Sequence, residues 1–146
     1  MKTVRLGIEC GRLPEDTGTD IPVILSKFGL LKDGKLNNAA AVLFGKHEDM
    51  EYPQCLLRLA RFKGTDKTVF MDSQRIQGNF FQLLNAAMAF IFKHLSLSGT
   101  TDTLEREEHL TIPYKAIREG VLNSLTHRSY KEAGGSVGIA IYDDRV

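Results

Sequence analysis

One apolar segment constrains the fold of this chain more than any other. Residues 79–95, NFFQLLNAAMAFIFKHL, place large apolar side chains at the spacing of a helix face. The segment is shorter than a bilayer-spanning helix, and polar side chains interrupt it at Gln82, Asn85, Lys93 and His94. We therefore expect a helix that supplies much of a hydrophobic core and does not cross a membrane.

Short apolar runs on both sides of this helix predict the sheet that it covers. The run AAAVLFG, residues 39–45, is continuous and ends in glycine, as expected of a strand buried on both faces. An alternating pattern near the C-terminus predicts another strand. The full set of predicted strands lies at residues 39–45, 54–64, 67–78 (at a sheet edge), within 106–113, and within 136–146.

Two further helices and a tight turn complete the predicted order. A short helix is expected from about Ile21, with Asp20 as its cap and Pro22 in its first turn, and the sequence KDGK then predicts a turn. Another helix is expected from about Pro113 to His127. The order predicts a mixed α/β (α+β) fold, in which a small mixed sheet has helices packed on it.

The predicted domain boundary follows residue 20. Residues 1–20 carry little pattern and are expected to form a linker or an arm that leads into the domain. Residues 21–146 are expected to form one α/β domain. Because the sequence stops directly after a strand, we expect this domain to be truncated at its C-terminal end.

Composition limits the classes of partner. Hydrophobic residues make up 42% and charged residues 25%, which is typical of a globular domain. The net charge of +1 provides no general attraction to nucleic acids or membranes, so such a partner would need a local patch. The segment RLARFKGTDK gathers Arg58, Arg61, Lys63 and Lys67, but an ordinary surface is the simpler interpretation. Two cysteines without metal-site spacing, and the absence of an export signal, predict a cytoplasmic protein.

The helix at 113–127 raises a question of function. Glu119, Asn123 and His127 are four residues apart, so they share an arc of about 80° over a length of about 12 Å. The plain interpretation is a solvated face opposite a buried one. Asn123 and Gly120 both disfavour a helix interior, however, and Gly120 leaves room for a close approach beside Glu119. The polar row is therefore a candidate ligand site.

The sequence AIREGVLNSLTHRSY, residues 116–130, resembles a helix of the ATP-binding C-terminal domain in RecG-related bacterial transcriptional regulators. Four further blocks resemble that family in the same order: LLKDGKLNNAAAVLFGK, RLARFKGTD, GNFFQLLNAAMAFIFKHL and AIYDDRV. Members of the family are described as ATP-dependent DNA helicases or regulators with a divergent AAA or Schlafen-type DNA-binding domain at the N-terminus. The resemblance implies that DNA is bound by a domain outside this chain.

The helix at 113–128 also resembles the N box of the GHKL (histidine kinase-type) nucleotide-binding fold. The resemblance implies that Glu119 is the general base that activates water, and that Asn123 binds Mg²⁺ and, through it, the phosphates of ATP. An amide oxygen suits Mg²⁺, and a carboxylate one turn away can orient a water molecule. His127 and Arg128 are the remaining candidates for cofactor binding.

The same fold needs a second box and a glycine-rich lid, which this sequence does not contain. We therefore expect only part of an ATP and Mg²⁺ site, no tight nucleotide binding and no ATP hydrolysis by the chain alone. The expected role links a DNA-binding domain to a nucleotide-sensing domain. The alternative is a dimerisation or protein-interaction module without nucleotide, in which the polar row is vestigial or is part of an interface, such as that of a homo-oligomer.

Overall fold

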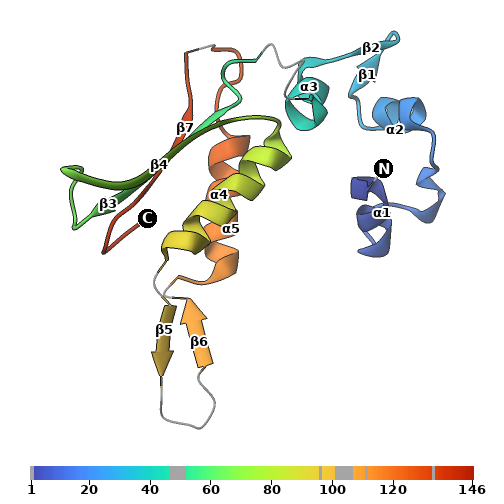
Figure 1. The fold of residues 1–146 in the computed structure, drawn as a ribbon. Coiled ribbons are helices and arrows are strands. Elements are labelled where there is room, and N and C mark those ends of the chain that lie inside the picture. The colour runs from blue at the N-terminus through green and yellow to red at the C-terminus, as the bar shows by residue number, and fades with distance from the viewer. Residues whose placement is uncertain (1, 47–51, 96, 101–106, 111, 133) are drawn as a thin grey trace. The chain divides into compact units, whose positions relative to one another are not determined.

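The computed structural model of the chain describes residues 2–46, 52–95, 97–100, 107–110, 112–132 and 134–146 (Figure 1). Helices and small sheets alternate along the chain, which confirms the predicted mixed α/β class. The chain divides into two compact units, Met1–Leu43 and Phe44–Val146. The predicted boundary after residue 20 lies inside the first of these units.

The first unit is made of short elements. They are α1 (Lys2–Glu9), a 3-10 turn (Glu15–Thr17), α2 (Ile21–Lys27), β1 (Leu31–Lys32), β2 (Lys35–Leu36) and most of α3 (Asn38–Phe44). The predicted cap of α2 is confirmed, since the Asp20 carboxylate accepts a hydrogen bond from the Val23 amide at 3.4 Å. The predicted tight turn is also confirmed: Asp33 and Gly34, with φ of 51° and 71°, connect β1 to β2.

Two predictions for this unit differ from the structure. Residues 39–45 are not a buried strand, because Asn38–Phe44 form α3. Alanine is the best helix former, and the Asn37 side chain caps the helix by accepting from the Ala40 amide at 2.9 Å. The second difference is α1, a helix within the weakly patterned first 20 residues.

The second unit is built on a three-stranded sheet of order β4-β3-β7. Its strands are β3 (Leu56–Lys63), β4 (Val69–Gln77) and β7 (Val137–Ile141), which confirms the strands predicted within 54–64, 67–78 and 136–146. The central strand β3 runs antiparallel to β4 and parallel to β7. Strand β4 is largely exposed and lies at an edge, as predicted.

Two helices cover one face of this sheet. They are α4 (Phe80–His94) and α5 (Tyr114–Thr126), and both confirm the sequence prediction. A reciprocal capping box starts α4, because Asn79 accepts from the Gln82 amide at 3.0 Å and the Gln82 side chain accepts from the Asn79 amide at 2.9 Å. Buried side chains of both helices join those of β3 and β7 in one hydrophobic core, which includes Leu57, Leu83, Ile91, Leu125 and Ile141.

A two-stranded antiparallel sheet lies between α4 and α5 in the sequence. It pairs β5 (Leu97–Thr100) with β6 (Glu107–Leu110). Strand β6 confirms the strand predicted within 106–113, whereas β5 lies in a segment for which the sequence predicted no strand. No helix in the described part of the chain has the length and apolar character needed to cross a membrane.

Candidate functional site

Helix α5 presents one apolar face and one polar face. It begins after Pro113, whose carbonyl accepts from the amides of Ala116 and Ile117 at 3.0 and 3.2 Å, so the proline is the cap rather than a first-turn residue. Ile117, Val121 and Leu125 are buried against the core. Their four-residue spacing fixes the rotation of the helix. The polar side is consequently directed away from the core.

The structure brings the predicted residues Glu119, Asn123 and His127 together as one exposed row on α5. Within the described residues, none of the three side chains has a hydrogen bond or ion pair with the protein. His127 is the C-cap residue, and its amide donates to the Asn123 carbonyl at 2.9 Å. Glu119 and Asn123 thus offer a carboxylate and an amide oxygen, one turn apart, with no competing partner in the described structure.

An open groove of about 360 Å³ lies between α5 and β7. Its α5 wall includes Ala116, Gly120 and Ser124, and its β7 wall includes Gly138 and Ile139. Asn123 is about 60° around the helix from Gly120, whereas Glu119 is about 100° from it. Asn123 is therefore the member of the polar row that lies next to the groove, where a polar amide is placed beside an apolar surface. Small ligands in proteins are commonly held by this combination.

Gly120 has no packing reason within the described protein. A Cβ atom at this position would meet no heavy atom within 4 Å, and the same is true of Gly138 across the groove. A glycine in a helix interior costs about 1 kcal/mol relative to alanine. The Ser124 hydroxyl, one turn later, already donates a hydrogen bond to the Gly120 carbonyl at 2.9 Å. The open space at Gly120 is thus available to a group outside the chain.

Arg128 lies apart from this row. Its guanidinium donates to the Gln54 carbonyl and, at 3.4 Å through Nε, to the Ser129 carbonyl, and it lies over the Tyr130 ring at 5.1 Å. The Gln54 amide donates to the Tyr130 carbonyl at 2.7 Å, and the Tyr130 hydroxyl donates to the Leu125 carbonyl at 2.8 Å. Arg128 therefore holds the end of α5 to the start of β3, a role that the sequence did not reveal.

The same corner buries two groups that titrate at high pH. Burial raises the pKa of the Cys55 thiol, although Arg128 opposes this shift. Burial also raises the pKa of the Tyr130 hydroxyl, and Cys55 adds to the effect. Both groups consequently stay neutral near pH 7. The corner is a packed structural element without an activated nucleophile.

A second hollow, of about 310 Å³, lies near the end of β3 and is lined in part by Arg61, His94 and Asp143. It shares Ile112 and Val146 with the groove. Arg61 forms an ion pair with Asp143, whose pKa is lowered by hydrogen bonds from Arg61 and from the Gly64 amide. Arg61 is therefore not free to contact phosphate, in keeping with the interpretation of this segment as ordinary surface.

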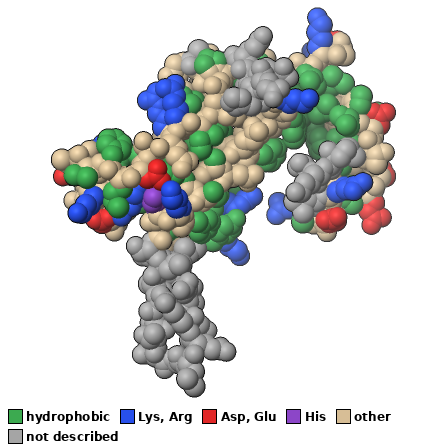
Figure 2. All heavy atoms as spheres, viewed as in Figure 1, with side chains coloured by type: hydrophobic (Ala, Val, Ile, Leu, Met, Phe, Trp, Pro, Cys, Tyr) green, Lys and Arg blue, Asp and Glu red, His purple; other side chains and the backbone are tan. Residues whose placement is uncertain are grey.

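Beside this hollow, Asp72 accepts from Lys93 at 2.9 Å and lies 2.8 Å from His94 Nε2. Figure 2 shows a histidine and charged side chains gathered in this region. These bonds tie β4 to the end of α4. No group of three or more metal-binding side chains occurs in the described residues.

Comparisons with known proteins add evidence on the fold alone. No protein-family model matches the chain, and no curated protein matches it. A solved structure, the DIP2311 protein from Corynebacterium diphtheriae, superposes with a TM-score of 0.66 at 14% sequence identity. The match covers 94% of this chain and 27% of that chain, so the present chain spans about a quarter of its length. The α/β architecture described here thus also occurs within a larger protein.

Proposed function

We propose that this chain carries part of a nucleotide site, with Glu119 and Asn123 on α5 as its polar residues. The observation that carries the proposal is their placement: both side chains are exposed and unpaired in the described structure, and they lie one helical turn apart on α5. Asn123 is next to the side of the helix that lines an apolar groove. Gly120 adds open space between them and the groove. A structural helix would gain from alanine at that position.

The chemistry of these groups suits Mg²⁺ and phosphate. Mg²⁺ prefers oxygen donors, keeps several water molecules and is commonly bound through one or two protein side chains together with substrate phosphates. The Asn123 amide oxygen would be its ligand here, and the Glu119 carboxylate would accept a hydrogen bond from a water molecule. His127, at the end of the row, would contact phosphate. When bound, Mg²⁺ would neutralise phosphate charge.

The resemblance of five sequence blocks to RecG-related transcriptional regulators supports a wider proposal. In it, the chain links a DNA-binding domain, outside these residues, to nucleotide sensing of the GHKL type, in the cytoplasm. Hydrolysis would need residues beyond those of α5, so the chain by itself would bind ATP weakly and would not turn it over.

A titration followed by two-dimensional NMR tests this proposal on the 146-residue chain. We expect millimolar Mg-ATP to shift the amide signals of residues 116–127 and of the β7 wall of the groove. Asn123→Ala should remove these shifts, whereas the exposed Asn85→Ala on α4 should leave them unchanged. Shifts that are scattered over the surface, or that persist in Asn123→Ala, would refute the nucleotide site.

A protein-interaction module is the second candidate, because strand β4 exposes a run of apolar side chains at a sheet edge. Val69, Phe70 and Met71 are 50%, 62% and 60% exposed. Exposed edge strands pair readily with other chains. Sedimentation equilibrium separates the candidates: an interaction module of this kind would self-associate, and Met71→Lys would abolish the self-association.

A further inference from the structure

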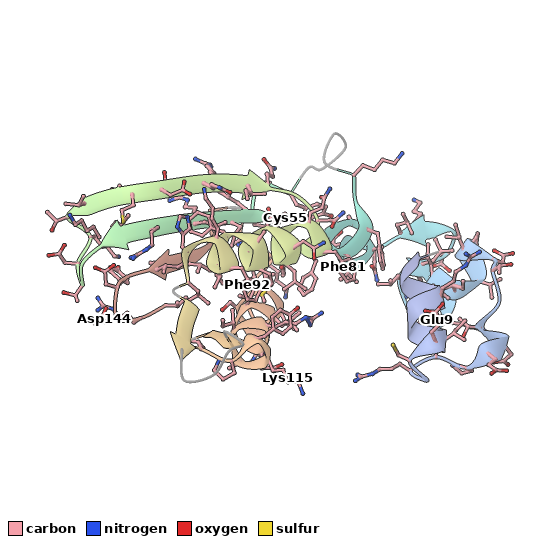
Figure 3. The ribbon with its side chains drawn as sticks, turned by 60° about the horizontal axis from the view of Figure 1, so that its bottom comes forward. Glu9, Cys55, Phe81, Phe92, Lys115 and Asp144 are labelled. Atoms are coloured by element: carbon pink, nitrogen blue, oxygen red, sulfur yellow. The ribbon has the colours of Figure 1, made fainter. Side chains whose placement is uncertain are left out.

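The three-stranded sheet of the second unit has two different faces. Leu57 and Leu59 point into the core with α4 and α5, so strand alternation places Arg58 and Ala60 on the other side. Figure 3 shows both helices on one side of the three strands. We call the side opposite α4 and α5 the open face. It is a surface of the second unit that these helices leave uncovered.

Two arginines lie directly opposite each other on the open face. The register of β3 and β4 pairs Arg58 with Arg75, and both residues are exposed. Within the described residues, neither guanidinium has an ion pair, and the neighbouring open-face positions hold Ala60, Ser73 and Gly138 rather than acids. Like charges at opposed positions destabilise a sheet. An anion that binds both guanidinium groups would relieve this repulsion.

Aromatic rings continue the same surface toward the end of β3. Phe62 follows Ala60 by two residues and therefore shares its face. The centroid of the Phe62 ring lies 4.5 Å from that of the Phe70 ring and 5.2 Å from that of the Tyr142 ring, on which it is stacked. Phe70 is 62% exposed, which is unusual for a large ring. The open face thus combines two unpaired positive charges with an accessible aromatic group.

We propose that the open face binds a single-stranded nucleic acid. Arg58 and Arg75 would contact backbone phosphates, and an unpaired base would stack on Phe70, about 13 Å further along the strands. A flat sheet with basic and aromatic side chains suits single strands, whose base faces are free, better than duplexes. The electrostatic attraction would come from this face and not from the protein as a whole, because the net charge of the chain is only +1.

Fluorescence anisotropy with labelled oligonucleotides of roughly 12 residues, within the range of single-strand binding sites, tests the proposal. The probes are oligothymidylate, oligouridylate and a DNA duplex of the same length, at about 50 mM salt and above. We expect both single strands to bind and the duplex to bind much more weakly. The logarithm of the binding constant should fall linearly with the logarithm of salt concentration.

Variants then assign the contacts. Replacing both arginines, Arg58→Gln with Arg75→Gln, should reduce the salt slope by about 1.4, since each phosphate contact of a single strand contributes about 0.7. Phe70→Ala should weaken binding roughly five-fold or more, as loss of a base stack does, with little change in the slope. Arg118→Gln on α5 removes one positive charge elsewhere and should change neither quantity.

Thermal melting monitored by circular dichroism establishes that each variant is folded before its binding is compared. The proposal is overturned if no single strand binds at low salt, if the duplex binds as tightly, or if the double arginine variant behaves as Arg118→Gln does. Loss of binding in Arg118→Gln, with the open-face variants unaffected, would also overturn it. None of these outcomes depends on nucleotide binding at α5.

Discussion

At the residue scale, the polar side chains of α5 and the residues that follow it differ in whether they bind other parts of the protein. Arg128 is held by two backbone carbonyls and an aromatic ring, whereas Glu119 and Asn123 have no partner in the described structure. Four-residue spacing is enough to predict that the row shares one helix face. The engagement of Arg128 depends on Gln54, 74 residues earlier in the chain, so helix periodicity alone could not reveal it.

Gly120→Ala is a direct test of why a glycine occupies the middle of α5. The added methyl group meets no atom of the described protein, so we expect the free energy of unfolding to rise by about 1 kcal/mol. Urea denaturation measures this change. The same variant should weaken the nucleotide-induced NMR shifts by filling the open space. A fall in stability would mean that the position is packed.

Arg128→Ala should destabilise the second unit by about 2 kcal/mol, because the charged hydrogen bonds to backbone carbonyls and the contact with Tyr130 are lost. Arg128→Lys should recover only part of this loss, since an ammonium group cannot reproduce the planar fork. Chemical denaturation of both variants is the measurement. Equal stability of Arg128→Ala and wild type would contradict the structural role given to this residue.

At the element scale, a helix was predicted correctly where the local sequence favoured a helix and its apolar face also matched the core that it packs against. Helix α4 has a capping box and an apolar face, and its predicted bounds are correct to within a residue. The prediction of a strand for AAAVLFG was wrong because a short apolar sequence is compatible with both a buried strand and a short helix. Alanine content and the Asn37 cap favoured the helix α3. The α5–β7 groove was not predictable, since it requires the placement of β7 beside α5.

The capping box makes a separate prediction about α4. Asn79→Ala removes the side chain that accepts from the Gln82 amide and donates to the Gly45 carbonyl at 3.0 Å. We expect a loss of about 1 kcal/mol in the free energy of unfolding. Asn85→Ala, on an exposed position of the same helix, is the control and should not destabilise. Similar losses in both variants would refute the importance of the cap.

The bonds that tie β4 to α4 make stability depend on acid. Hydrogen bonds from Lys93 and His94 lower the pKa of Asp72 below its ordinary value of 3.8. A lowered pKa in the folded state means that the stabilisation is complete above about pH 3.8 and is lost as pH falls through the lowered value. Asp72→Asn should flatten the acid limb of a plot of melting temperature against pH. An unchanged acid limb would show that the contact contributes nothing.

At the scale of the whole molecule, the chain consists of two compact units, and the candidate surfaces lie in the second. The polar row lies on α5 and the groove lies between α5 and the edge strand β7, whereas Arg58 and Arg75 lie on the open face of β3 and β4. The two surfaces can therefore be altered separately. Loss of the nucleotide site through Asn123→Ala should leave oligonucleotide binding unchanged, and loss of both arginines should leave Mg-ATP binding unchanged. Anisotropy and NMR titrations of the two variants check this independence.

Calorimetric titration of millimolar Mg-ATP into the 146-residue protein, with Asn123→Ala and Asn85→Ala beside it, is the most direct test of the nucleotide site at α5. We expect wild type and Asn85→Ala to bind Mg-ATP, and Asn123→Ala not to bind it while its melting temperature stays nearly the same. Absence of binding by the wild type, or equal binding by all three proteins, would contradict a nucleotide site at α5.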